Sequence, residues 1–262
     1  MATLGSAQAG SPAAPAVRRI GPADLQWALA EGWADFREKR GDLIFVGLLY
    51  PLIGLVTAAV TLNSQLLPLV FPLVAGLSIL GPAVASGFYE LARRREEGQD
   101  VGWSHFLDPL RGPNVGTLAM LTAVQGILFL GWLAVAWGIY QATLGRLQPV
   151  GLSGFLQVLL QTGEGWTMIL LGNLAGGVFA VLTLILSVAS FPLAVDKKVD
   201  APTAILTSLR AVRTNPAAIA QWGLRIALLL ALGSLPAFIG LAVVLPVLGY
   251  ATWHLYTRLV ER

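Results

Sequence analysis

Four stretches of this chain carry no charged side chain, and each is long enough to cross a lipid bilayer. They are residues 43–89, 112–145, 165–195 and 226–257. A transmembrane helix needs only about 20 consecutive, mainly apolar residues. Surface helices of water-soluble proteins keep a polar face and are interrupted by charges much sooner. The sequence therefore predicts that most of the chain lies in lipid.

The first stretch must hold two spans, because residues 43–89 would extend about 70 Å as a single helix. A turn is indicated by the polar segment from Asn63 to Gln65, followed by Pro68. The six expected spans cover residues 43–62, 66–89, 115–142, 166–195, 217–234 and 236–257. The last two depend on a break between Gly233 and Pro236. Without this break the chain has five spans.

The placement of basic residues favours six spans. With the amino terminus in the cytoplasm, 15 of the 17 lysines and arginines fall on the cytoplasmic side, with Arg146 outside and Arg225 within a span. Cytoplasmic loops of membrane proteins carry such an excess of basic residues. Five spans would move Arg258 and Arg262 to the outer face. We therefore predict a multi-pass protein of the cell inner membrane with both termini in the cytoplasm.

Two regions before and between the spans are typical of amphipathic surface helices. Residues 22–40 and 200–214 are expected to lie in the cytoplasmic membrane interface. In the second helix, Asp200 is the expected N-cap, and the apolar face is expected to comprise Ile205, Leu209 and Val212. The acid Asp35 is expected on the polar face of the first helix.

The domain organisation is correspondingly simple. Residues 1–19, which are rich in Ala, Gly, Pro and Ser, predict a disordered cytoplasmic tail. Residues 20–262 predict a single transmembrane domain. The expected fold class is all-α, a polytopic transmembrane helical bundle of about six spans with cytoplasmic interfacial amphipathic helices.

Arg225 is the charged residue that the predicted spans accommodate least easily. An arginine at the centre of a span costs about 2.5–3.5 kcal/mol, whereas each Leu or Ile contributes only about 0.3–0.6 kcal/mol to insertion. The residue therefore has to extend its side chain toward the cytoplasmic interface or find a partner inside the bundle. The alternative to such snorkelling is pairing with Glu90 or with a bound anionic group.

Four further polar residues complete the candidate intramembrane site, and each has a structural and a functional interpretation. Glu90 is either an interfacial charge with basic neighbours or the partner of Arg225. His254 is either a hydrogen-bonded interfacial histidine or a ligand. Asn173 and Gln125 are expected to bond neighbouring helices more often than a substrate.

Small residues at helical spacing predict places where helices approach closely. Gly172 and Gly176 form one such pair in the fourth span, and Ala83 and Gly87 form another in the second. In a chain with 29 glycines, packing within the bundle is the favoured interpretation over dimerisation. The oligomeric state is left open.

The composition excludes several function classes. The chain has no cysteine and only two histidines, so no metal site, haem or other cofactor is expected. The basic residues lie at the ends of spans, which argues against nucleic-acid binding. The sequence contains no H-E-x-x-H motif, no phosphate-binding glycine loop and no G-x-S-x-G motif. We therefore expect that the protein is not an enzyme.

Several segments resemble an uncharacterised family of proteobacterial integral membrane proteins defined only as a domain of unknown function. The residues that carry the resemblance are Trp27 to Phe36, Leu80 to Pro82, Gly87 to Leu91, Pro192 with Asp196, Ser208 with Asn215 and Pro216, and Leu245 to Tyr256. Tyr250 stands where we expect histidine in relatives. The resemblance implies a multi-span inner-membrane protein and no particular reaction.

The predicted function is that of a non-enzymatic accessory or organising subunit for other membrane proteins, with the lipid bilayer as its surroundings. The alternative is a permease for a small or amphiphilic solute, in which proline-broken helices surround Arg225 and Glu90. A water-filled cavity that reaches Arg225 would favour the permease. A tightly packed interior would favour the accessory subunit.

Overall fold

The computed structural model describes residues 15–38, 67–147, 151–236 and 238–262. These residues form helices and one isolated bridge, and contain no β-strand. An N-terminal helix covers residues 22–38. The helices that follow are η1 (Leu67–Leu69), α2 (Val70–Gly76), η2 (Leu77–Leu80), α3 (Gly81–Glu96), η3 (Trp103–Leu110), α4 (Val115–Thr143), α5 (Gly151–Gln161), α6 (Gly163–Ser187), α7 (Ser190–Asp196), α8 (Ala201–Thr214), α9 (Pro216–Ser234) and α10 (Leu241–Leu259). The predicted all-α class is confirmed.

Within the described residues, 4 helical segments are long and apolar enough to cross a membrane. They are Val70–Glu96, Val115–Thr143, Gly163–Asp196 and Pro216–Ser234. These segments match the second to fifth expected spans. The first expected span, residues 43–62, lies outside the described residues. The expected sixth, residues 236–257, corresponds to α10, which is not among the four, because the segment from Tyr250 to His254 makes it more polar. Six spans are therefore not confirmed.

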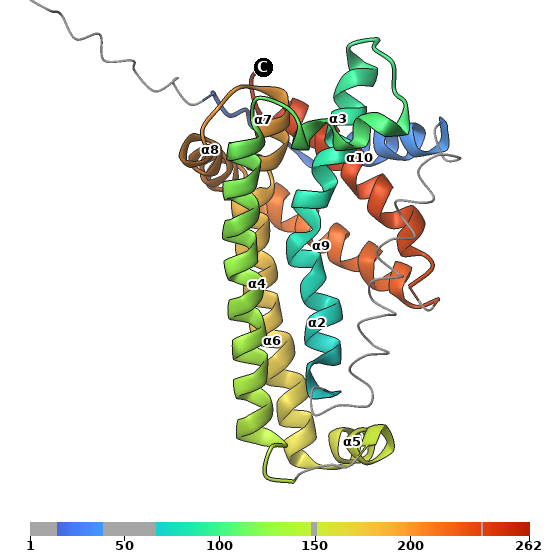
Figure 1. Ribbon diagram of the computed structural model, residues 1–262, viewed down its shortest axis with the longest axis vertical. Helices are drawn as coiled ribbons and strands as arrows, with labels where there is room; N and C mark the ends of the chain where they lie inside the picture. Colours follow the sequence, from blue (N-terminus) through green and yellow to red (C-terminus); the bar gives the residue numbers. More distant parts are fainter. Residues whose placement is uncertain (1–14, 39–66, 148–150, 237) are drawn as a thin grey trace, which may run out of the picture.

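Figure 1 shows how these elements are arranged. α4 and α6 run side by side along the molecule, and α2 and η2 pack against α4. α5 lies across one end of this bundle. The N-terminal helix, α7, α8 and the carboxyl-terminal parts of α3 and α10 gather at the other, which we call the polar end. α9 and α10 run obliquely and pack against each other.

The outward faces of the bundle are apolar. Ile127 and Leu130 of α4 are 70% and 65% exposed, and Leu170 and Leu174 of α6 are each 61% exposed. Apolar side chains exposed along whole helices are unfavourable in water but are expected in contact with acyl chains. These faces are consistent with a bundle that is surrounded by lipid.

A hydroxyl group from another helix occupies the break between α6 and α7. In an uninterrupted helix the Ala189 amide would donate to the Ile185 carbonyl. Here Ser208 of α8 lies between them, accepting from the Ala189 amide at 3.2 Å and donating to the Ile185 carbonyl at 2.8 Å. Pro192 supports the break, because it has no amide hydrogen for the Val188 carbonyl.

α8 begins as predicted but packs through a different face. The Asp200 carboxylate accepts a hydrogen bond from the Thr203 amide at 2.8 Å, which confirms the N-cap. The expected apolar face, Ile205, Leu209 and Val212, is only half-buried. The buried face consists mainly of small residues, namely Ala201, Ala204, Ser208 and Ala211. Small side chains form the buried face because they let α8 approach α6 and α7 closely.

The two ends of the described chain are joined. Val17 and Val260 form an antiparallel bridge, and the Arg18 amide donates to the Leu259 carbonyl at 2.9 Å. The Asn215 side chain accepts from the Ile20 amide at 2.8 Å and donates to the Arg18 carbonyl at 2.9 Å. The predicted disordered tail therefore extends too far, since residues 16–19 are part of the fold.

Candidate functional site

The polar end brings together an acidic residue of the N-terminal helix with α3 and α10. Asp35 is only 5% exposed, although the sequence placed it on the polar face. Its carboxylate lies 2.9 Å from Nη1 of Arg95 and 2.8 Å from Nε2 of His254, and Arg95 also pairs with Glu38. A buried carboxylate needs such partners to offset its lost hydration. The three helices are thus joined through this carboxylate.

His254 is held on both of its sides. Besides its contact with Asp35, its ring meets the edge of the Trp27 ring at a centroid distance of 5.6 Å. Arg258 in turn lies over the Trp27 ring at 4.2 Å. His254 is thus hydrogen-bonded within the fold, and its position relative to a membrane interface stays a prediction.

Glu90 pairs with its own helix and not with Arg225. It is buried, and its two carboxylate oxygens accept from Nη2 and Nε of Arg93 at 2.6 and 2.9 Å. Arg94 lies 3.7 Å away. Bidentate contact of this kind satisfies a carboxylate well. The structure therefore supports the local interpretation of Glu90.

A second ion-pair cluster fixes the carboxyl terminus. Arg262 binds both oxygens of Asp196 at 3.0 Å and contacts Glu96 at 2.5 Å. The Tyr256 hydroxyl donates to Asp196 at 2.8 Å. Burial alone would lower the pKa of Arg262, but the hydrogen bonds and charges of Asp196 and Glu96 outweigh it, so this pKa lies above its ordinary value.

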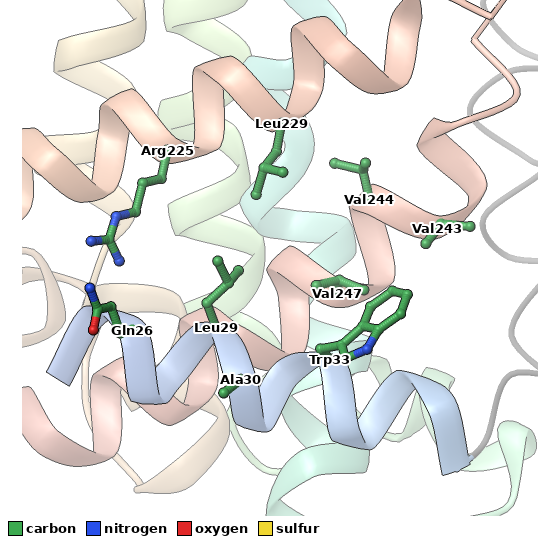
Figure 2. A pocket seen from close by; sticks show the side chains of 9 residues that line it. All are labelled: Gln26, Leu29, Ala30, Trp33, Arg225, Leu229, Val243, Val244 and Val247. Atoms are coloured by element: carbon green, nitrogen blue, oxygen red, sulfur yellow. The ribbon is translucent and has the colours of Figure 1, made fainter. Parts of the chain in front are cut away.

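An apolar groove with a volume of about 540 Å³ lies along the N-terminal helix. One wall is the N-terminal helix, and the other walls are α9 and α10 (Figure 2). Leu29, Leu229 and Val247 are among the aliphatic side chains that line it. Arg225 and Gln26 lie at the same end of the groove and point toward one another.

Arg225 is half-buried and makes no hydrogen bond or ion pair with any described residue. Its guanidinium extends from α9 toward the N-terminal helix (Figure 2). The sequence analysis asked whether a cavity reaches Arg225. One does, and its lining is mainly aliphatic.

The two neutral candidates have different surroundings. Gln125 is 1% exposed, and neither polar atom of its side chain has a hydrogen-bond partner among the described residues. The Thr183 hydroxyl and the Trp222 indole nitrogen are also buried without a hydrogen-bond partner among the described residues. Asn173 is exposed and donates to the Ile169 carbonyl of its own helix at 2.8 Å. It therefore bonds neither a neighbouring helix nor the groove.

The predicted small-residue pairs are used in part. A Cβ atom at Gly87 would lie 2.5 Å from the Phe106 ring, and one at Gly176 would lie 3.3 Å from Trp132. Gly172 faces open space, and Ala83 packs at the edge of the main core. One close contact between two helices was not predicted, because a Cβ atom at Gly32 of the N-terminal helix would lie 2.6 Å from the Ala251 amide nitrogen of α10.

The sequence analysis also missed two buried acids that pair with arginine, Asp35 with Arg95 and Asp196 with Arg262. A signal for Asp35 exists, since it follows Leu25, Ala28 and Gly32 at helical spacing, and these three residues are buried against α10 and its neighbours. Its partners lie far along the chain, and no local pattern identifies them.

Comparison with known proteins identifies a family over part of the chain. Residues 70–196 match the model of the family described as predicted integral membrane protein (DUF2189). The resemblance to an uncharacterised membrane-protein family is confirmed over these residues, which run from α2 to the end of α7. No curated protein and no solved structure matches the chain.

Proposed function

We propose that this chain, which carries a domain of a predicted integral membrane protein family over residues 70–196, is a non-enzymatic accessory or organising subunit for other membrane proteins. In this proposal it lies in the inner membrane, with the polar end and both termini in the cytoplasm. The positive-inside distribution of its basic residues supports this orientation.

The observation that carries the proposal is the internal pairing of the buried acids. Asp35, Glu90 and Asp196 are each bound by arginine, histidine or tyrosine side chains. General acid-base chemistry needs a titratable group within reach of a substrate. The described groove is lined by aliphatic residues, glutamine, tryptophan and arginine, with no acid. This arrangement supports a structural role for the polar end.

The outward face of α6 supports contact with partner helices. Leu174 and Val178 are 61% and 59% exposed, and a Cβ atom at Gly177 between them would meet nothing within 4 Å. An exposed glycine among apolar residues allows a second helix to approach closely in a membrane. We expect a partner protein to contact this face.

Photo-crosslinking in cells tests the proposal. A photoreactive residue at Leu174 is expected to capture a reproducible membrane protein, and Gly177→Leu is expected to reduce that capture, because it fills the contact. Gly126→Leu in α4, also an open glycine, is the matched control and is expected to leave capture unchanged. Failure to recover any reproducible partner, or equal effects of both variants, contradicts the proposal.

The groove at Arg225 favours a second candidate, a permease for an amphiphilic solute. This candidate needs a path that opens to both sides of the membrane. Reconstituted vesicles would then release a trapped amphiphile faster with the wild-type chain than with Leu229→Trp, which fills the groove. Equal release rates argue against it and leave the accessory role in place.

A further inference from the structure

We propose that the groove between the N-terminal helix and α9–α10 is a binding site for an anionic phospholipid of the surrounding bilayer, with its phosphate at Arg225 and part of one acyl chain along the aliphatic walls. This inference does not depend on the organising role. Lipid occupancy is a property of the purified chain, whether or not the chain has protein partners.

The first argument is the charge of Arg225. The guanidinium is half-buried in an apolar groove and has no acidic partner among the described residues. A cation in such surroundings loses hydration, and this loss has to be offset by an opposite charge or by hydrogen bonds. A phosphate diester provides both, because its oxygens match the donor geometry of a guanidinium.

The second argument is the gradient of polarity along the groove. Gln26 and Arg225 form one end, while Leu29 and Leu229 and then Val243 and Val244 line the part beyond them (Figure 2). A site for a small soluble anion would be polar throughout. A ligand with an anionic head and an alkyl chain complements both parts. The volume of about 540 Å³ falls in the range of small-ligand sites.

The third argument is continuity with the lipid-facing surface. On α9, Leu224, Leu228 and Leu232 are 60%, 55% and 61% exposed, whereas Leu229 on the same helix lines the groove. A bilayer lipid therefore reaches the groove along α9 without leaving apolar surroundings. A soluble metabolite would have to cross this apolar surface first.

Lipid retention measured by native mass spectrometry tests the charge. The purified chain is incubated with vesicles containing equal amounts of phosphatidylglycerol and phosphatidylcholine with identical acyl chains. The wild-type chain is expected to retain the anionic lipid in preference. Arg225→Gln is expected to retain it about tenfold less, the loss of one charge-assisted contact. Arg213→Gln, an exposed arginine in α8, is the matched control and is expected to behave as wild type.

A second pair of variants tests the acyl-chain position without altering charge. Leu229→Trp fills the groove and is expected to reduce retention of phosphatidylglycerol about as much as Arg225→Gln does. Leu170→Trp places the same bulk on the exposed face of α6, which does not line the groove, and is expected to have no effect. This pair keeps the proposal testable if Arg225→Gln does not fold.

Several outcomes overturn the proposal. They are equal retention of both lipids by the wild-type chain, equal losses for Arg225→Gln and Arg213→Gln, and full retention by Leu229→Trp. A photoreactive residue at position 229 provides a direct reading, because it is expected to label the phospholipid. Labelling of residues 39–66 or of a second copy of the chain would instead identify the occupant of the groove as protein.

Discussion

Asp35 is an acidic side chain buried between three helices, and its carboxylate contacts Arg95 and His254. Asp35→Asn leaves Arg95 and His254 without this carboxylate in a site with little water. Removing one member of a buried ion pair costs about 3–5 kcal/mol. We expect the free energy of unfolding in a denaturing-detergent titration to fall by this amount. Asp100→Asn, whose side chain is 81% exposed, should change it by less than about 0.5 kcal/mol.

Because the sequence has no cysteine, the effect of Asp35→Asn on the N-terminal helix can be measured with a single introduced cysteine. Ala28 is fully buried, so a cysteine introduced there is expected to react slowly with a water-soluble maleimide. Combining Ala28→Cys with Asp35→Asn should accelerate labelling, because the N-terminal helix then leaves α10 more often. Unchanged labelling would show that the carboxylate does not hold this helix in place.

Ser208 is a single hydroxyl group on which the junction of two helices depends. Ser208→Ala leaves the buried Ala189 amide without an acceptor, and such a loss costs about 1–3 kcal/mol. We expect the thermal unfolding midpoint in detergent to fall accordingly. Ser234→Ala is the control, because that hydroxyl bonds only the Leu230 carbonyl of its own helix. A similar effect of both variants would contradict the bridging role.

At the scale of elements, the N-cap of α8 makes helix stability depend on pH. The hydrogen bond from Thr203 lowers the pKa of Asp200 below its ordinary value. A lowered folded-state pKa means that its contribution is present above the unfolded pKa of about 3.9 and is lost as the pH falls through the folded value. The stability difference between wild type and Asp200→Asn should therefore be constant at neutral pH and shrink below about pH 4.

The N-terminal helix packs so closely on α10 that there is no room for a side chain at Gly32. A Cβ atom at Gly32 would lie 2.6 Å from the Ala251 amide nitrogen. Backbone cannot move aside cheaply, so Gly32→Ala should destabilise the fold by about 1–3 kcal/mol. Gly126→Ala faces open space in α4 and should be neutral or stabilising by up to about 1 kcal/mol. Equal unfolding curves for the two variants would show that α10 yields to the added methyl group.

The sequence predicts helix positions well where a long apolar segment has the length needed to cross a bilayer. α4 and α9 begin and end within two residues of the expected spans, because a mainly apolar segment of membrane length has one stable form in lipid. α8 was located correctly but its packing face was not, since small residues carry no hydrophobic signal. The contact between Asp35 and His254 joins residues 219 positions apart, which local periodicity does not reveal.

At the scale of the whole molecule, the bridge between Val17 and Val260 places both ends of the described chain on one side. Reporter domains fused to the two termini are therefore expected to give the same signal. The distribution of basic residues predicts the cytoplasmic signal for both. Reporters on opposite sides of the membrane would contradict the bridge, and two periplasmic signals would contradict only the predicted orientation.

The same closure has a consequence for biosynthesis. Residues 16–18 find their partners in residues 259–261, which are synthesised after all the helices described above. Residues 16–18 are thus made early, but they can pair only after the described membrane helices have been synthesised. A message that stopped short of residue 259 would yield a chain that keeps its membrane helices but lacks the partner of its amino-terminal segment.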